Sequence, residues 1–216
     1  MGRTTALMVP QYDGVTHDFF EAEVNSAPYT FGVFDKETQA CGIVKKSGVS
    51  QNSTEISAKL EKLLNSSAIP EQAGVRIVVD PISDPQGFIE QLRNSSSITK
   101  FSFTASFENP FDVNELIQRP AEKFAEIAGA DKAKVEVEGE SLNEEVLEEL
   151  ARGVASTGET AAATIRQEGV TRGKRIYLKG NPVQEAIEEG DSPRTIYAAI
   201  WDATKIGYSR VRNAVI

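Results

Sequence analysis

Cysteine and histidine are almost missing from this 216-residue sequence, which has one of each, Cys41 and His17. A single cysteine excludes a disulfide within the chain and any zinc or iron–sulfur site built from several cysteines. It is also typical of the reducing cytoplasm, where we expect this protein to be found. A histidine-based catalytic triad would depend on His17 alone, which we interpret as a surface residue. We interpret Cys41, within an apolar run, as a small buried side chain.

Long apolar runs are also absent. None approaches the roughly 20 residues that a membrane span requires, so we predict no transmembrane helix. The apolar part of the N-terminal stretch is too short for a secretory signal. Glycine-rich phosphate loops of the forms GxxxxGK[ST] and GxGxxG do not occur. These absences argue against the common ATP, GTP and dinucleotide enzymes, and we expect no cofactor.

The composition that remains is that of an ordinary globular protein. Hydrophobic residues make up 40% of the chain and charged residues 25%, with a net charge of −9. Such an acidic balance argues against a protein whose whole surface binds nucleic-acid backbone. A net negative charge is still compatible with a local basic patch.

The stretch from Ile98 to Gly129 is the most regular of the sequence. Apolar and small polar residues alternate from Ile98 to Phe107, so Phe101, Phe103, Ala105 and Phe107 should share one buried face of a strand. Asn109-Pro110 ends this pattern. Asp112 then begins a helix, and after Pro120 a second helix should follow to Ala128 with Phe124 and Ile127 turned inward.

Other segments complete the predicted fold. Two β-hairpins are expected, at 29–44 and at 160–179, and a short β-branched strand at 75–79. Helices should begin at Asn52, after Asp84-Pro85, near Ser141, with Val146, Leu147, Leu150 and Val154 as its apolar stripe, and at Asp191-Ser192-Pro193. The predicted class is α+β, a mixed sheet with two β-hairpins and helices packed on it. We divide it into 1–95, 96–180 and 181–216, with a single domain formed by the first two as the alternative.

An alternative for the N-terminal half is a ribonuclease H-like α/β arrangement, because its expected order of strands and helices is similar. That activity needs several acids around two Mg²⁺ ions. Asp80, at the end of its predicted strand, and Glu55, from a helix, are the metal-ligand candidates. The first strand has no acid, where that family places a central ligand. A metal-dependent nuclease is therefore the alternative function, and a turn role for Asp80 the simpler interpretation.

A basic cluster occupies the second predicted hairpin. It consists of Arg166, Arg172, Lys174, Arg175 and Lys179. Such a hairpin could contact phosphates, which makes a nucleic-acid-binding module a further alternative. The simpler interpretation is a solvated hairpin that faces the acidic helix in the segment from Arg119 to Glu159.

The last predicted helix has aromatic residues beside its aliphatic stripe. Tyr197, Ile200, Trp201 and Tyr208 make too much of its circumference apolar for an exposed helix. These residues either pack in the core or form an interface with a partner, where large aromatics dominate the binding energy. We predict them as interface residues.

A resemblance adds one expectation. Three segments resemble uncharacterised bacterial proteins carried on mobile elements, some of them in anti-phage defence cassettes. They are residues 76–85, Phe101-Ser102-Phe103 and residues 109–112. The resemblance implies no catalytic residue. Together with the lack of reactive clusters, it favours a non-enzymatic binding or assembly component that acts on a protein partner or as a homo-oligomer.

Overall fold

The computed structural model describes residues 5–26, 29–46, 48–50, 52–106, 117–188 and 192–212. The chain forms two compact units, the first from Met1–Phe31 and Ile43–Ile77 and the second from Gly32–Gly42 and Val78–Ile216. No boundary falls after residue 95 or 180, where we had divided the chain. The predicted strand residue Phe107 and the helix beginning at Asp112 lie outside the described residues.

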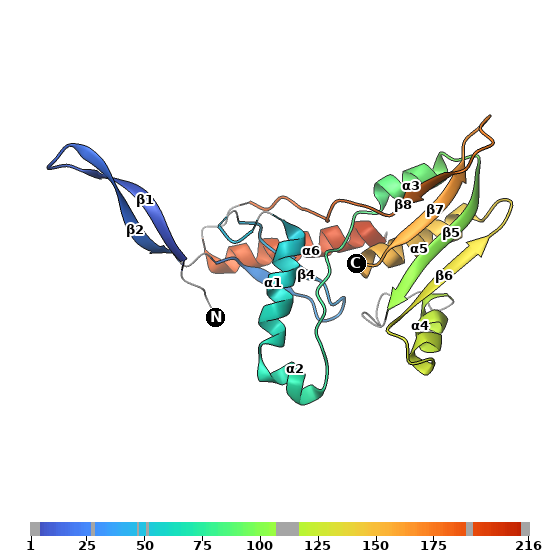
Figure 1. Ribbon diagram of the computed structural model, residues 1–216, viewed down its shortest axis with the longest axis horizontal. Helices are drawn as coiled ribbons and strands as arrows, with labels where there is room; N and C mark the ends of the chain where they lie inside the picture. The colour runs from blue at the N-terminus through green and yellow to red at the C-terminus, as the bar shows by residue number, and fades with distance from the viewer. Residues whose placement is uncertain are drawn as a thin grey trace. The chain divides into compact units, whose positions relative to one another are not determined.

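A four-stranded sheet organises the second unit, in the order β6-β5-β7-β8. Its strands are β5 (Ser97–Ser106), β6 (Lys132–Glu138), β7 (Ala161–Arg166) and β8 (Lys174–Tyr177), shown side by side in Figure 1. The α+β class is confirmed, and β7 and β8 form the second predicted hairpin. All pairs in this sheet are antiparallel, so the sheet is not mixed.

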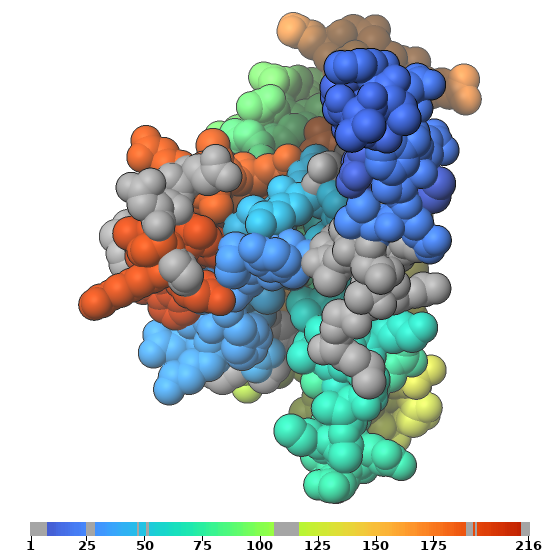
Figure 2. All heavy atoms as spheres, turned by 90° about the vertical axis from the view of Figure 1, so that its left-hand side faces the viewer, coloured from blue at the N-terminus to red at the C-terminus, as the bar shows by residue number. Residues whose placement is uncertain are grey.

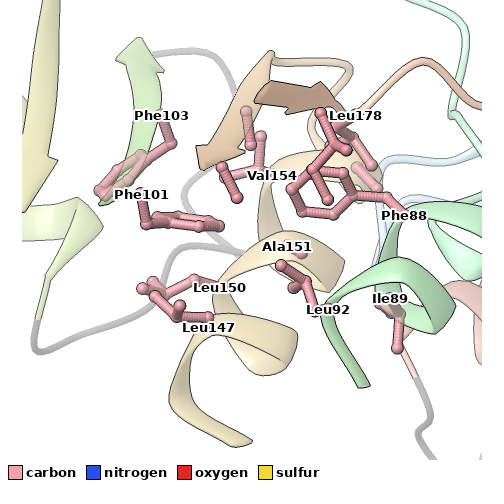
Figure 3. Packing of buried hydrophobic residues seen from close by; sticks show 14 of the residues in the cluster. Phe88, Ile89, Leu92, Phe101, Phe103, Leu147, Leu150, Ala151, Val154 and Leu178 are labelled. Atoms are coloured by element: carbon pink, nitrogen blue, oxygen red, sulfur yellow. The ribbon is translucent and has the colours of Figure 1, made fainter. Parts of the chain in front are cut away.

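The core lies on one face of this sheet. Phe101, Phe103 and Ala105 of β5 are buried as their alternation predicts. They pack with α3 (Gln86–Arg93) and α5 (Glu144–Ser156), and Figure 3 shows Phe101 beside the leucines of α5. These helices contribute Phe88, Ile89, Leu92, Leu147, Leu150 and Val154. The strand periodicity therefore predicted the centre of this unit correctly.

Helix α4 (Gln118–Ile127) corrects one expectation. Phe124 and Ile127 are 71% and 77% exposed, not turned inward. The residues that face the sheet are Gln118 and Ala125, which are buried, and Ala121, which is packed against the core. These three follow helical spacing, and the small alanines let the helix approach the strands closely.

The remaining elements of the second unit are a small hairpin and a long helix. The strands β3 (Gly32–Phe34) and β4 (Cys41–Ile43) form the first predicted hairpin, although they are shorter than expected. Helix α6 (Pro193–Arg212) begins where predicted. It passes so close to β4 that a Cβ on Gly42 would lie 1.9 Å from the Thr204 hydroxyl oxygen, so a side chain at this position would force Thr204 to move.

The first unit contains β1 (Thr5–Asp13), β2 (Asp18–Ser26), α1 (Ser53–Asn65) and α2 (Ala68–Ala73). The amide of Thr54 donates to the Asn52 side chain, which caps α1 as expected. The strand predicted at 75–79 is absent. The side-chain amide of Asn65 hydrogen bonds both the N–H and the C=O of Ile77, at 2.9 and 2.6 Å, and so replaces a neighbouring strand there. The ribonuclease H-like alternative thereby loses the strand it needed before Asp80.

Among the described residues, no helix combines the length and the apolar character needed to cross a membrane.

Candidate functional site

The β1–β2 hairpin is the feature of the first unit that the sequence analysis missed. Its two strands pair from Thr5 with Ser26 to Asp13 with Asp18. The Asp13 carboxylate accepts the N–H of Val15 at 2.8 Å, and the His17 N–H donates to the Asp13 carbonyl at 2.9 Å. The backbone N–H of Val15 is the main cause of the lowered pKa of Asp13. Asp13-Gly14 within alternating residues is a hairpin signal that could have been recognised.

Nearly all side chains of this hairpin are in solvent. From Met8 to Val24, every residue is exposed except Asp13 and Ala22, which are half-buried. Large apolar residues are among the exposed ones, with Tyr12 at 55% and Phe19 at 73%. The hairpin atoms are blue in Figure 2, where they face the viewer. Scattered exposed apolar residues are normal, but a run of them on one element indicates a surface that another molecule covers.

Both faces of the hairpin are apolar. Tyr12 and Phe19 are cross-strand partners on one face, with ring centroids 5.2 Å apart, and Met8 lies on the same face. The other face has Val9, Phe20, Ala22 and Val24, of which only Ala22 is half-buried. A two-stranded ribbon has no inner face in which to bury such residues, and isolated hairpins are marginally stable in water.

The first unit provides no core for them either. Among its described residues only Ser50, Ser57 and Pro70 are buried. Leu63 of α1 is 47% exposed and Ile69 of α2 is 75% exposed. The large buried hydrophobic cluster lies entirely in the second unit. The first unit therefore has apolar residues at helical and strand spacing without the interior that such spacing normally serves.

The hairpin is also acidic. Asp13, Asp18, Glu21 and Glu23 are its charged residues, and no lysine or arginine occurs between Thr5 and Ser26, so its charge is −4. Within the described part of the chain, neither Glu21 nor Glu23 makes an ion pair. A surface with this pattern suits a partner that is apolar and basic.

The interface residues predicted on α6 lie in different environments. Ile200 is 3% exposed and faces β4, so its side chain packs within the chain. Tyr197 is 44% exposed. Trp201 and Tyr208 are half-buried, and the Lys205 ammonium lies 5.1 Å from the Trp201 ring centroid. The helix thus exposes fewer large apolar side chains than the hairpin does.

The predicted nucleic-acid contacts come together on the β7–β8 hairpin. All five basic residues (Arg166, Arg172, Lys174, Arg175 and Lys179) are exposed. The Arg175 guanidinium and the Lys179 ammonium lie 5.5 and 5.2 Å from the ring centroid of Tyr177, which is itself half exposed. All five therefore lie on the hairpin at one edge of the sheet, with Lys174 and Arg175 on opposite faces of β8.

The metal candidates do not form a site. Asp80 is exposed and lies against Gly158, whose added Cβ would be 2.5 Å from the Asp80 Cβ. Glu55 belongs to the other unit, where it accepts a hydrogen bond from the Ser50 hydroxyl at 2.7 Å. No group of three or more His, Cys, Asp and Glu side chains suited to a metal ion occurs among the described residues. The described chain therefore lends no support to the nuclease alternative.

The single histidine, His17, and the single cysteine, Cys41, also belong to no metal-binding group among the described residues. His17, at φ 56°, closes the hairpin turn, and its Nδ1 lies 2.9 Å from the Tyr12 hydroxyl. Cys41 is exposed, not buried as we had expected. Its surroundings still withdraw the thiol from water enough to raise its pKa, which keeps it protonated at neutral pH.

Comparison with protein-family models, with curated proteins and with solved structures finds no match for this chain. Its function is therefore argued from the geometry above.

Proposed function

We propose that this protein is a binding or assembly component that acts through protein–protein contacts, and that its β1–β2 hairpin is the main contact surface. The observation that supports this most directly is the exposure of Met8, Tyr12, Phe19 and Phe20 on an element without a core. Burying large side chains of this kind contributes about 1.5–3 kcal/mol each. A partner that covers several of them would gain enough to bind stably.

The aromatic pair supports the same conclusion. Tyr and Phe are enriched in the contact regions that dominate binding energy. Tyr12 and Phe19 already hold each other in place across the strands, so little side-chain entropy is lost when a partner binds. A preformed aromatic patch on a paired ribbon is suited to docking. The link to anti-phage defence remains a prediction from the resemblance alone, and the proposal does not depend on it.

The test is capture of partners by the full chain from the cells that make it, followed by quantitative mass spectrometry. We compare wild type with Phe19→Ser/Phe20→Ser and with the control Phe124→Ser/Ile127→Ser, which removes equally large exposed residues from α4. Partners should be lost with the hairpin variant and kept with the control. Thermal unfolding of each purified variant confirms that it is folded.

The opposite pattern would contradict the proposal. If the hairpin variant retains the same partners, or if only the α4 variant loses them, the contact surface lies elsewhere.

A further inference from the structure

The acidic apolar hairpin has a complement on the same chain. The β7–β8 hairpin, from Ala161 to Lys179, contains five basic residues and one acid, Glu168, so its charge is 5 − 1 = +4. That balances the −4 of the β1–β2 hairpin. No other strand pair of the described chain has such opposed charge, and opposed surfaces attract over about 10 Å at 0.1 M salt.

The five basic side chains of the β7–β8 hairpin are exposed, so a partner can reach them. In the described part of the chain, none of the five forms an ion pair. This contrasts with the middle of the sheet, where the Lys100 ammonium is bound by Glu136 at 2.7 Å and also by Glu138. The sheet thus pairs its central cation directly, whereas Arg175 acts on Glu136 only over a longer distance and adds to the lowering of the pKa of that carboxyl, which Lys100 mainly causes.

Strand β8 also has an open edge. It pairs with β7 on one side and with no described strand on the other. An exposed edge strand can accept another strand through backbone hydrogen bonds. Of the two strands of the acidic hairpin, β2 is the better donor, because β1 contains Pro10, which lacks an N–H.

The side chains fit this pairing. Arg175 and Tyr177 share one exposed face of β8, with Lys174 on the opposite face, and Phe19, Glu21 and Glu23 share one exposed face of β2. Cross-strand pairs of opposite charge and of aromatic residues each stabilise a sheet by about 0.2–1 kcal/mol. A symmetric pairing of two β2 strands would instead bring Glu21 and Glu23 of both copies together, and like charges across strands are destabilising.

We propose that the occupant of the β1–β2 hairpin is a second copy of this chain, whose β8 edge it extends. This rests on the proposed function and deepens it. The two surfaces are different, so the contact is heterologous: each copy offers one hairpin and one edge, and copies add head to tail into rings or open chains. Nucleic acid is disfavoured as the hairpin's occupant because four carboxylates would repel it.

The test is sedimentation velocity of the full-length chain over a concentration series at low and high salt. Wild type should associate as concentration rises, and less so at high salt. Glu21→Lys/Glu23→Lys alone and Lys174→Glu/Arg175→Glu alone should each associate about tenfold more weakly. Mixed in equal amounts, the two variants should associate again, since each then offers the surface that the other needs.

The control Glu37→Lys/Glu71→Lys changes the net charge equally at two other exposed acids and should associate like wild type. Failure of the mixture to associate overturns the proposal. So does a wild type that sediments as a monomer at every concentration, as it would if the hairpin paired with β8 of its own chain, or a Glu21→Lys/Glu23→Lys variant that associates as strongly as wild type, since these acids would then contribute nothing to the contact.

The same experiments separate this inference from the proposed function. A wild type that is monomeric at every concentration, but whose hairpin still captures a different protein, refutes the second copy as partner and leaves the hairpin as a contact surface. If wild type associates and Phe19→Ser/Phe20→Ser associates equally well, the second copy does not bind at the hairpin; the proposed function is refuted as well if this variant also retains its captured partners.

Discussion

Gly180 shows how a single residue holds the second unit together. The Asp84 N–H donates to the Asn181 carbonyl at 3.0 Å, and a Cβ built on Gly180 would lie 2.0 Å from the Asp84 carbonyl oxygen. Two backbone segments thus pass each other with no room for a side chain.

Gly180→Ala should therefore lower the free energy of unfolding by about 2 kcal/mol, because the backbone of Asp84 must move. Gly87→Ala is the matched control, since nothing lies within 4 Å of its added Cβ in α3. That variant should be about 0.5 kcal/mol more stable than wild type, because alanine favours helix. Urea denaturation measures both, and equal stabilities would refute the close approach.

Glu148 is the second residue on which this unit depends. Its carboxylate contacts Arg93 of α3 at 2.6 Å and Arg152 of α5 at 2.9 Å. Arg152 also donates to the carbonyl of Val211 at 3.1 Å, so the network joins α3, α5 and α6. Burial acts to raise the pKa of Glu148, but the hydrogen bonds and charges of the two arginines prevail and lower it.

Because the pKa of Glu148 is lower in the folded state, ionised Glu148 stabilises the fold, and this stabilisation depends on pH in a defined direction. The stabilisation is complete above the ordinary value of 4.5 and is lost as the pH falls through the lower pKa of the folded state. Glu148→Gln should cost about 2 kcal/mol at neutral pH, and the difference should shrink below pH 4.5. Urea titrations from neutral to acidic pH measure this, with the exposed Glu90→Gln as control. A difference from wild type that is constant with pH would contradict it.

At the scale of elements, the apolar stripe predicted for helix α5 is correct for most of its residues but not for all. Leu147, Leu150 and Val154 are buried as the stripe predicts, but Val146 of the same stripe is 44% exposed. The helical period of 3.6 leaves the border of an apolar stripe undefined, and only the packed sheet decides which border residue is covered.

Leu150→Ala should cost about 3 kcal/mol, because it leaves a cavity beside Phe101. Val146→Ala should change the free energy of unfolding by less than about 0.5 kcal/mol. Thermal and urea unfolding measure both. Similar losses for the two variants would show that Val146 is covered in solution.

Other elements show where sequence alone was insufficient. The alternation in β5 predicted its buried face, because a period of two needs only neighbours in the chain. The strand expected at 75–79 failed because a distant side chain, Asn65, binds the backbone of Ile77. The inward face of α4 was misjudged because small alanines, not Phe124, allow close packing on the sheet. Long-range contacts of this kind leave no local pattern.

At the scale of the whole molecule, burial is distributed unevenly. The second unit has a continuous core of phenylalanine, leucine, isoleucine and valine, whereas the described part of the first unit buries Pro70 and two serines. A unit with so small an interior gains little stability from the hydrophobic effect. We therefore expect the first unit to become more stable when a partner binds its β1–β2 hairpin. The candidate site could be only partly predicted, because the aromatic residues of β1 and β2 were visible in the sequence but their lack of a covering core was not.

Photo-crosslinking tests the central claim most directly. p-Benzoyl-L-phenylalanine placed at Phe19, in the cells that make the protein, reacts with whatever lies against the hairpin, and the same group at Phe124 is the control, since both side chains are more than two-thirds exposed. We predict a discrete protein adduct from Phe19 and none of the same mass from Phe124. No adduct from Phe19, or the same adducts from both positions, would contradict the account.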